Sequence, residues 1–283
     1  MPTPEPGIYH NVPFDEYASW EACHKSDLWL LNEQPLAKYR WVLDHGDKAD
    51  REELLIGHAT HTAILERDDF RTRYIIRPRT YENDKGEEKA FNLNSKVCKA
   101  LLADLKKQGK LVLKRDHYEL ATRMRDAVWA HPTARLILEG GGVEVSIVWV
   151  DPKSGLLCKA RIDVWHGPVL ADIKTAECIA ATRFGRASYR WGYHFQAGMY
   201  LDGAQIASGT EVNQFYIIAV EKEPPYLVKV YEVEQGDLDI GRAQRDWILE
   251  KVKQAQDTGQ WPGYDADVSP LAIPSWAGQE LMA

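Results

Sequence analysis

The sequence predicts an α/β fold of the α+β kind, with a central mixed β-sheet flanked by helices. Apolar residues at helical spacing dominate the first 130 residues, and runs rich in β-branched residues begin at Val143. From there the expected order is three strands, two helices, two strands and one long helix, which favours one sheet covered by helices. We expect a single domain over 1–283, with a mainly helical part (1–135), a core (136–260) and an irregular tail (261–283).

The helical part is expected to begin with a loop over residues 1–24 that carries aromatic anchors. Ser26 is a candidate N-cap for a first helix, and Pro35 could open a second. Residues 51–66 have apolar positions that fit one buried side of a third helix. The charged segment 78–90 is expected to be a mobile surface loop. Two further helices are expected at 91–107 and 115–130.

The core is expected to contain five strands. The first two form a hairpin through the turn sequence Asp151–Gly155. The expected strands are Val143–Val150, Leu156–Trp165, Val169–Lys174, Gln214–Val220 and Leu227–Val233. Helices are expected at 178–189, 192–206 and 236–258, and the proline-containing tail is expected to be irregular.

The composition restricts the class of protein. The 283 residues are 45% apolar and 27% charged, which is ordinary for a globular domain in water. No apolar run approaches the ~20 residues of a membrane span, and the proline-rich start lacks the pattern of a secretory signal. The four cysteines have no CxxC spacing, so we expect no zinc site and a reducing cytoplasm.

Two neighbouring strands carry charged residues at alternate positions. Lys159, Arg161 and Asp163 share one face of the second expected strand, and Asp172 and Lys174 share one face of the third. If these strands pair through the short turn between them, two carboxylates and a lysine meet at one place.

This trio suits a divalent metal and phosphate chemistry. Mg²⁺ prefers carboxylate oxygens, a backbone carbonyl and water, and Asp163, Asp172 and the carbonyl of Ile173 could supply them. The metal lowers the pKa of a bound water and neutralises charge on an attacked phosphate. Lys174 would orient that water or stabilise the developing charge. We expect Mg²⁺ as cofactor, with Mn²⁺ as a substitute, and the number of metals stays open.

An Asp-x-Lys pair alone is more often a solvated surface pair, so neighbouring residues matter. The residues around Asp172 are apolar, which predicts a buried strand with unusual charges. Glu144 could join the carboxylates, and an exposed strand position is an equal alternative. Gln196 and Tyr200 share one helix face and could contact a phosphate or the water, or could simply form a polar helix face.

His58 and His61 are three residues apart on an expected helix. They could both face the site, although such a pair is more often structural. The chain has no HExxH, GxxxxGK[ST] or GxGxxG motif, which argues against a zinc protease and a nucleotide-binding loop.

At these residues the chain resembles the PD-(D/E)xK nuclease superfamily and, more narrowly, the RecE (exodeoxyribonuclease VIII) nuclease domain. The residues that carry the core resemblance are Glu144, Arg161, Asp163, Asp172, Lys174, Thr175, Gln196 and Tyr200. The resemblance extends to Gly7–Tyr9, Asp15–Tyr17, Lys25–Leu28, Ile56–His61, Leu65–Glu66, Trp149–Pro152, Gly155–Cys158, Trp261–Pro262 and Pro274–Trp276. It covers nearly the whole chain and departs mildly at Ile162, where the family often has proline.

The resemblance implies a restriction-endonuclease-like core and a role for each site residue. The metal ligands would be His61, rather than His58, with Asp163, Asp172 and the carbonyl of Ile173. The catalytic set would be Lys174, Asp163, Asp172, Glu144, Gln196 and Tyr200. Within it Lys174 would be the catalytic lysine, and Glu144 would bind the 5′ end or support the metal.

The resemblance also implies an activity and partners. Relatives degrade one strand of linear duplex DNA from its 5′ end and leave a 3′ tail for an annealing protein of the RecT kind. They form homo-oligomeric rings, here expected to be a trimer or tetramer in the cytoplasm of a bacterial or phage-infected cell. The net charge of −7 counts against DNA binding, but a ring could confine basic residues to its channel. The expected channel residues are Lys159, Arg161, Arg183, Arg186 and Arg190.

Three alternatives stay open. One is a structure-specific endonuclease or Cas4-like repair nuclease, although the scattered cysteines argue against an iron–sulfur cluster. Another is a non-catalytic DNA-binding module with a decayed site, which the presence of both carboxylates and the lysine disfavours. A metal-dependent hydrolase of another phosphoester is the weakest of the three.

Overall fold

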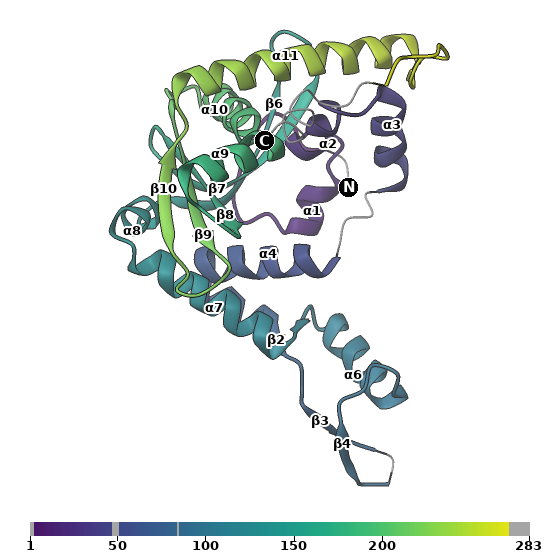
Figure 1. Cartoon of the computed structure of the whole chain (residues 1–283), viewed down its shortest axis with the longest axis vertical. Coiled ribbons are helices and arrows are strands. Elements are labelled where there is room, and N and C mark those ends of the chain that lie inside the picture. Colours follow the sequence, from purple (N-terminus) through teal and green to yellow (C-terminus); the bar gives the residue numbers. More distant parts are fainter. Residues whose placement is uncertain (1–2, 47–50, 84, 272–283) are drawn as a thin grey trace, which may run out of the picture.

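The computed structural model describes residues 3–46, 51–83 and 85–271. One six-stranded mixed sheet lies at its centre (Figure 1), which confirms the expected fold class. The strands, in order across the sheet, are β1 (Gly7–Tyr9), β6 (Gly142–Val150), β7 (Leu157–His166), β8 (Val169–Ala176), β9 (Gln214–Glu221) and β10 (Val228–Glu232). Neighbours pair antiparallel except β8 and β9, which are parallel.

Helices cover both faces of the sheet. One face carries α10 (Tyr193–Ser208) and α11 (Gln235–Thr258), together with α2 (Lys25–Leu30), α3 (Leu36–His45) and α9 (Ala181–Trp191). The other face carries α4 (Arg51–Leu65), α7 (Arg115–Ala130) and α8 (Pro132–Leu138). Fully buried Phe195 and Phe215 anchor the first core, and Ile64, Met124 and Ile218 anchor the second.

Helix α10 is held close to α11. A Cβ on Gly241 would lie 2.2 Å from the carbonyl oxygen of His194, so only glycine permits this approach of the two backbones. Because α10 is buried on nearly all sides, its position and rotation relative to the sheet are fixed. This places the side chains of α10 accurately against β8.

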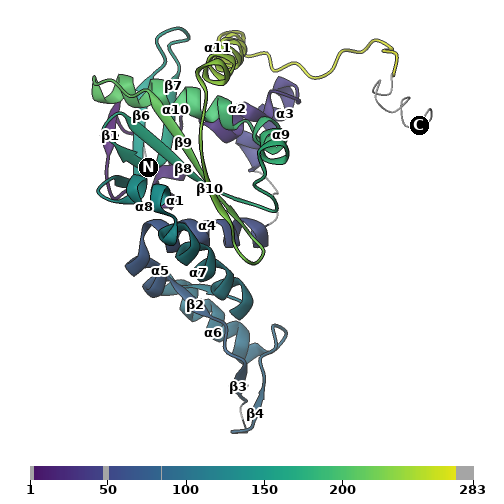
Figure 2. The same cartoon turned by 60° about the vertical axis from the view of Figure 1, so that its left-hand side comes forward.

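Residues 67–114 form a projecting arm between α4 and α7 (Figure 2). The arm contains α5 (Arg67–Arg73), β2 (Tyr74–Ile76), β3 (Thr80–Glu82), β4 (Glu88–Ala90), α6 (Lys96–Lys107) and β5 (Leu111–Leu113). Strands β2 and β5 pair in parallel, and β3 and β4 form a hairpin. At its base Phe70, Tyr74 and Leu113 pack with residues of α4 and α7.

Two expectations about this part of the chain are corrected. Residues 78–90, expected to be a mobile surface loop, contain the β3–β4 hairpin. The side chain of Asn83 stabilises its turn by accepting the N–H groups of Lys85 and Glu87, each at 3.0 Å. The helix expected at 91–107 begins at Lys96.

The other expected helices and strands are present, with ends shifted by a few residues. Helix α2 begins at Lys25, so His24 rather than Ser26 holds the N-cap position. Short elements of three to seven residues were not expected, including α1 (Phe14–Ser19), α5, α8, β1, β2 and β5.

The tail is irregular over 261–271, and Pro274–Trp276 lie outside the described residues. Among the described helices, none is long and apolar enough to cross a lipid bilayer.

Candidate metal centre

The candidate centre lies where the β7–β8 pairing ends. The two strands pair from His166 and Val169 back to Val164 and Ala171. One residue further on, a carboxylate oxygen of Asp163 accepts the N–H of Ile173 at 2.8 Å. The side chain thus takes the place of a backbone acceptor and fixes the carboxylate between the two strands.

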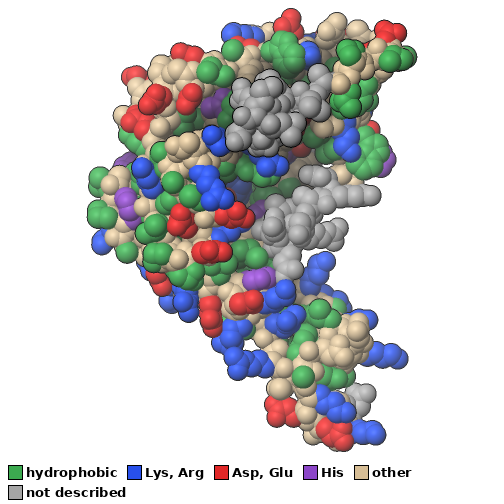
Figure 3. Space-filling view, in the orientation of Figure 1, with side chains coloured by type: hydrophobic (Ala, Val, Ile, Leu, Met, Phe, Trp, Pro, Cys, Tyr) green, Lys and Arg blue, Asp and Glu red, His purple; other side chains and the backbone are tan. Residues whose placement is uncertain are grey.

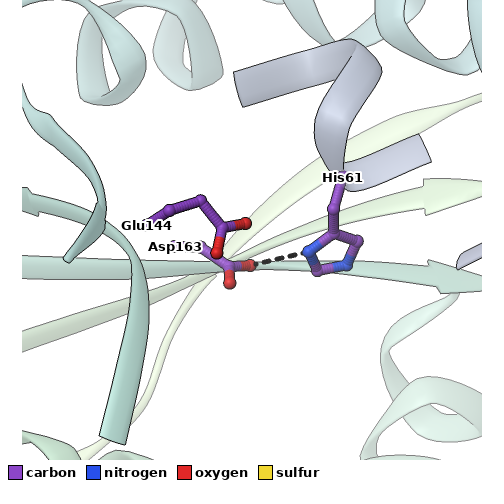
Figure 4. A group of neighbouring side chains, drawn as sticks. All are labelled: His61, Glu144 and Asp163. Atoms are coloured by element: carbon purple, nitrogen blue, oxygen red, sulfur yellow. Dashed lines mark ion pairs between the residues drawn. The ribbon is translucent and has the colours of Figure 1, made fainter. Parts of the chain in front are cut away.

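The neighbouring strand β6 is distorted at the same level. Glu144 has φ of 50° within the strand, a conformation that costs about 1–3 kcal/mol for a residue with a side chain. On β7 the side-chain alternation is also broken here, because Ile162 packs in one core and Val164 in the other although residues two apart on a regular strand share a face. The distortion directs Glu144 toward Asp163 (Figure 4).

His61 completes the group from the last turns of α4, which packs on one face of the sheet. Its Nδ1 lies 3.2 Å from a carboxylate oxygen of Asp163. One ligand atom each from His61, Glu144 and Asp163 lie within 4.8 Å of one another. His58 is exposed and its ring packs on Phe14. Of the two histidines, His61 is therefore the one placed to bind a metal.

The three side chains are strongly coupled electrostatically. Burial alone would lower the pKa of His61, but Asp163 and Asp172 raise it to about 9. Burial would raise the pKa of Asp163, but His61 and Lys174 hold it below its ordinary value. Burial and the charge of Asp163 raise the pKa of Glu144 against the opposing effect of Arg161. Without a metal, protonated His61 therefore supplies the positive charge in this group.

A second group on β8 and α10 holds the lysine. Asp172 accepts a hydrogen bond from Gln196 Nε2 at 2.5 Å on one oxygen, and its other oxygen lies 2.5 Å from Lys174 Nζ. This second oxygen is buried, and its partner among the described residues is the ammonium group of Lys174 in the ion pair. Burial would lower the pKa of Lys174, but Asp172 and Asp163 raise it. Lys174 is therefore a cation at neutral pH.

The sequence analysis missed two residues of this second group. The ring of Tyr193 lies 4.8 Å from Lys174 Nζ. Lys25 donates to the carbonyl of Trp191 at 2.6 Å, and burial together with Lys174 lowers its pKa to about 7. Tyr193 lies on the same helix face as Gln196 and could have been found from that spacing. Lys25 belongs to the resembling segment Lys25–Leu28 but had no role assigned, and only the fold brings it close enough to Lys174 to interact.

The donor set fits a divalent cation. Two carboxylates and one imidazole suit Mg²⁺ or Mn²⁺, and the strained backbone at Glu144 brings the second carboxylate into range. Glu144 joins His61 and Asp163 in this group, whereas Asp172 is held by Lys174 and Gln196, so metal binding by Asp172 stays a prediction. Asp172 lies close enough to interact with the group, since burial and the charge of Asp163 both raise its pKa against the opposing effect of Lys174. The N–H of Ile173 binds Asp163, and metal binding by its carbonyl stays a prediction.

The remaining expected site residues have different surroundings. Tyr200 is half-buried, and its ring lies 6.5 Å from that of Phe215. Its pKa is raised well above the ordinary value by burial, with smaller contributions from neighbouring acidic groups. Arg183, Arg186 and Arg190 are exposed on α9.

The expectation that Lys159 and Arg161 face a DNA channel is wrong. Lys159 is buried, and its ammonium group donates to the carbonyls of Tyr17, Ala18 and Trp20. Arg161 is mostly buried and binds Glu144 and the carbonyl of Val12. Both cations attach the N-terminal segment or a site residue to β7, so neither is available to DNA.

The residues 32–269 match the family model of a PDDEXK-like domain of unknown function, DUF3799. The chain belongs to this family. The match covers most of the chain, and it includes every residue of the two groups except Lys25. The PD-(D/E)xK assignment inferred from the site residues is thereby confirmed.

A solved structure agrees with the fold. The crystal structure of a "putative exonuclease" from Eubacterium rectale is similar with a TM-score of 0.62 and 12% sequence identity. The similarity covers 97% of this chain and 99% of that one. No curated protein matches the chain.

Proposed function

We propose that the protein is a metal-dependent exodeoxyribonuclease that degrades linear duplex DNA from its ends. The observation that carries this proposal is the grouping of His61, Glu144 and Asp163 beside a lysine that stays charged. A metal site next to a fixed cation is suited to phosphodiester hydrolysis. Membership of a PDDEXK-like family and the name of the similar E. rectale protein support the same choice.

The chain's own residues have separable tasks in this reaction. A divalent cation held by His61, Glu144 and Asp163 would lower the pKa of a bound water and neutralise phosphate charge. Lys174 cannot act as a base while its pKa is raised, so it serves as a cation that orients the water and stabilises negative charge on the phosphate. Asp172 holds Lys174 in place, and Gln196 in turn holds Asp172.

The finer proposals are 5′→3′ polarity, a 3′ single-stranded product, and Mg²⁺ as the preferred ion with Mn²⁺ as a substitute. A RecT-like annealing protein would receive the product during recombination. These proposals rest on the resemblance to the RecE nuclease domain at Asp163, Asp172, Lys174 and Gln196.

The test uses three DNA substrates of one sequence with Mg²⁺. Two are linear duplexes labelled at either the 5′ or the 3′ end, and the third is a covalently closed circle. We expect loss of linear DNA only, with early release of the 5′ label. Lys174→Ala should lower the rate by about 10²–10³-fold, the range for removing one transition-state donor, and EDTA should abolish the reaction.

The controls separate the alternatives. Lys253→Ala, near the end of α11, removes the same charge and should leave the rate unchanged, because among the described residues that lysine pairs with Asp257 and with no residue of the metal centre. Cleavage of the circle would indicate an endonuclease instead. Binding without cleavage of any substrate would indicate a non-catalytic module and overturn the proposal.

A further inference from the structure

Charge is unevenly divided between the arm and the rest of the protein. The arm, residues 67–114, has 13 Lys and Arg against 7 Asp and Glu. The whole chain has 35 against 42, so the other residues have 22 against 35. An acidic protein therefore carries a segment with net charge +6, and Figure 3 shows Lys and Arg side chains gathered along it.

One face of α6 presents a row of lysines. Lys96, Lys99, Lys106 and Lys107 are spaced so that all four fall within about a third of the helix circumference. All four are exposed. Their spacing along an exposed helix matches a ligand that carries repeated negative charges rather than a single anion.

A groove at the base of the arm adds further positive charge beside α7. Its volume is about 520 Å³, and it is lined by Arg77, Pro78, Arg79, Phe91, Lys114, Arg115, Asp116 and Glu119. Arg115 lies 3.8 Å from Glu119, and Arg77 lies over the ring of Phe91. Arg79 is exposed. Four cations face two acidic groups there, so the groove remains basic.

The arm is connected directly to the metal centre. Helix α4 carries His61 and ends at Leu65, and the arm begins two residues later. Only Glu66, with a non-helical φ of −126°, separates the helix that carries His61 from the first helix of the arm. The chain returns from the arm into α7, which packs beside α4.

We propose that the arm binds the sugar–phosphate backbone of duplex DNA whose end lies at the metal centre. This inference rests on the proposed function, since it assigns that site its substrate-holding surface. Phosphate contacts dominate non-specific DNA affinity and require Lys and Arg at intervals, which α6 and the groove supply. Protein–protein interfaces are depleted of lysine, so the lysine row favours a nucleic acid over a second copy of the chain.

The test measures binding of the intact protein to a 5′-phosphorylated duplex of about 30 base pairs, in EDTA and at several salt concentrations. The arm variant carries K96Q, K99Q, K106Q and K107Q. The matched control carries K38Q, K153Q, K251Q and K253Q, which remove the same charge from α3, the β6–β7 turn and α11. Each lost phosphate contact lowers the slope of log K against log salt by ~0.9. We expect the arm variant to lose about 3 to 4 from the slope and the control to keep the wild-type slope.

A second readout separates this inference from the proposed function. Hydrolysis of bis(p-nitrophenyl) phosphate reports on the metal centre without the arm, so both variants should retain the wild-type rate with Mn²⁺. A wild-type slope in the arm variant would overturn the inference whether or not the small diester is hydrolysed. A reduced slope with no hydrolysis by the wild-type protein would support the arm and contradict the nuclease. A change of oligomeric mass in the arm variant, with unchanged DNA binding, would assign the arm to a second copy instead and overturn the inference.

Discussion

Glu144 combines a strained backbone with a buried carboxylate between Arg161 and Asp163. Sequence reasoning left its role open, because a glutamate at alternate spacing on a strand is usually exposed. The distortion of β6 directs the carboxylate of Glu144 into the site, and no sequence pattern predicts this distortion. Asp163, Asp172 and Lys174 could be predicted because charged residues in an apolar strand are unusual.

Glu144→Gln should weaken metal binding while leaving the fold intact. The amide keeps the shape of the side chain but removes its negative charge, so we expect Mn²⁺ affinity to fall by about 10–100-fold, as on loss of a supporting carboxylate. Calorimetric titration measures it. Glu139→Gln, whose side chain pairs with Arg135 at the surface, is the control. Equal affinities in both variants would remove Glu144 from the metal group.

Metal affinity should rise with pH through the neutral range. In the metal-free protein Asp163 and Asp172 overcome burial and raise the pKa of His61 to about 9, so the ring is protonated below that pH. A cation must displace this proton, and affinity should increase up to tenfold per pH unit until about pH 9. Titrations in two buffers of different ionisation enthalpy would show the released proton. A pH-independent affinity between pH 7 and 9 would mean that His61 is not a ligand.

The same shift stabilises the metal-free fold at low pH. The pKa of His61 is raised from 6.5 in the unfolded chain, so the stabilisation is fully present below about 6.5 and is lost as pH rises toward 9. Other groups add their own pH dependence. A comparison with His61→Gln isolates this contribution in urea unfolding, and the difference between the two proteins should shrink from pH 6 to pH 9.

Lys159→Met should act on stability and leave DNA binding unchanged. The substitution keeps most of the apolar side chain but leaves three carbonyls without the ammonium donor. We expect a loss of roughly 3 kcal/mol in the free energy of unfolding, measured with urea. If stability were unaltered and the salt dependence of DNA binding were weaker, Lys159 would instead contact DNA, as the sequence analysis expected.

At the scale of elements, the longer helices and strands follow from hydrophobic periodicity, but the short ones do not. A segment such as β2 or β5 has three residues, too few for a periodic signal. The N-terminal β1 pairs with β6 across a long separation in sequence. The hairpin at 80–90 was mistaken for a loop because its exposed, charged strands have no apolar alternation.

Gly241→Ala should separate α10 from α11. The new methyl group would lie 2.2 Å from the carbonyl oxygen of His194, so one backbone must move. We expect about 1–3 kcal/mol of destabilisation from overpacking, seen in thermal or urea unfolding. Because Gln196 lies on α10, hydrolysis should also slow in the folded protein. Gly236→Ala is the control, since no atom lies within 4 Å of its added Cβ, and equal effects of the two would contradict this account.

At the scale of the whole molecule, the net charge of −7 is an average of two unlike parts. Composition alone argued against DNA binding, and the ring hypothesis placed the positive charge on β7 and α9. The positive charge lies instead on the arm, which could not be recognised from the sequence because only a charged loop at 78–90 and a helix at 91–107 were expected there. A sum of charges therefore says little about a protein whose charges are separated in space.

The ring remains a proposal with a direct measurement. Sedimentation equilibrium at micromolar concentration should give three or four times the mass of 32.2 kDa. We expect the arm variant to give the same mass, because the proposed arm contacts are with DNA. A monomer at all concentrations would exclude a ring and leave the arm as the means of holding DNA.

The contact between Lys159 and the N-terminal segment also has a consequence for folding during synthesis. Lys159 binds the carbonyl of Trp20 across 139 residues, so the N-terminal segment emerges long before its partner strand. At ~5–20 residues per second, the ribosome takes roughly 7 to 30 s to make the residues between them. For that time the segment around Trp20 stays without the strand that holds it in the folded protein. Whenever the N-terminal segment is detached, the edge of β6 that β1 covers is open to other strands.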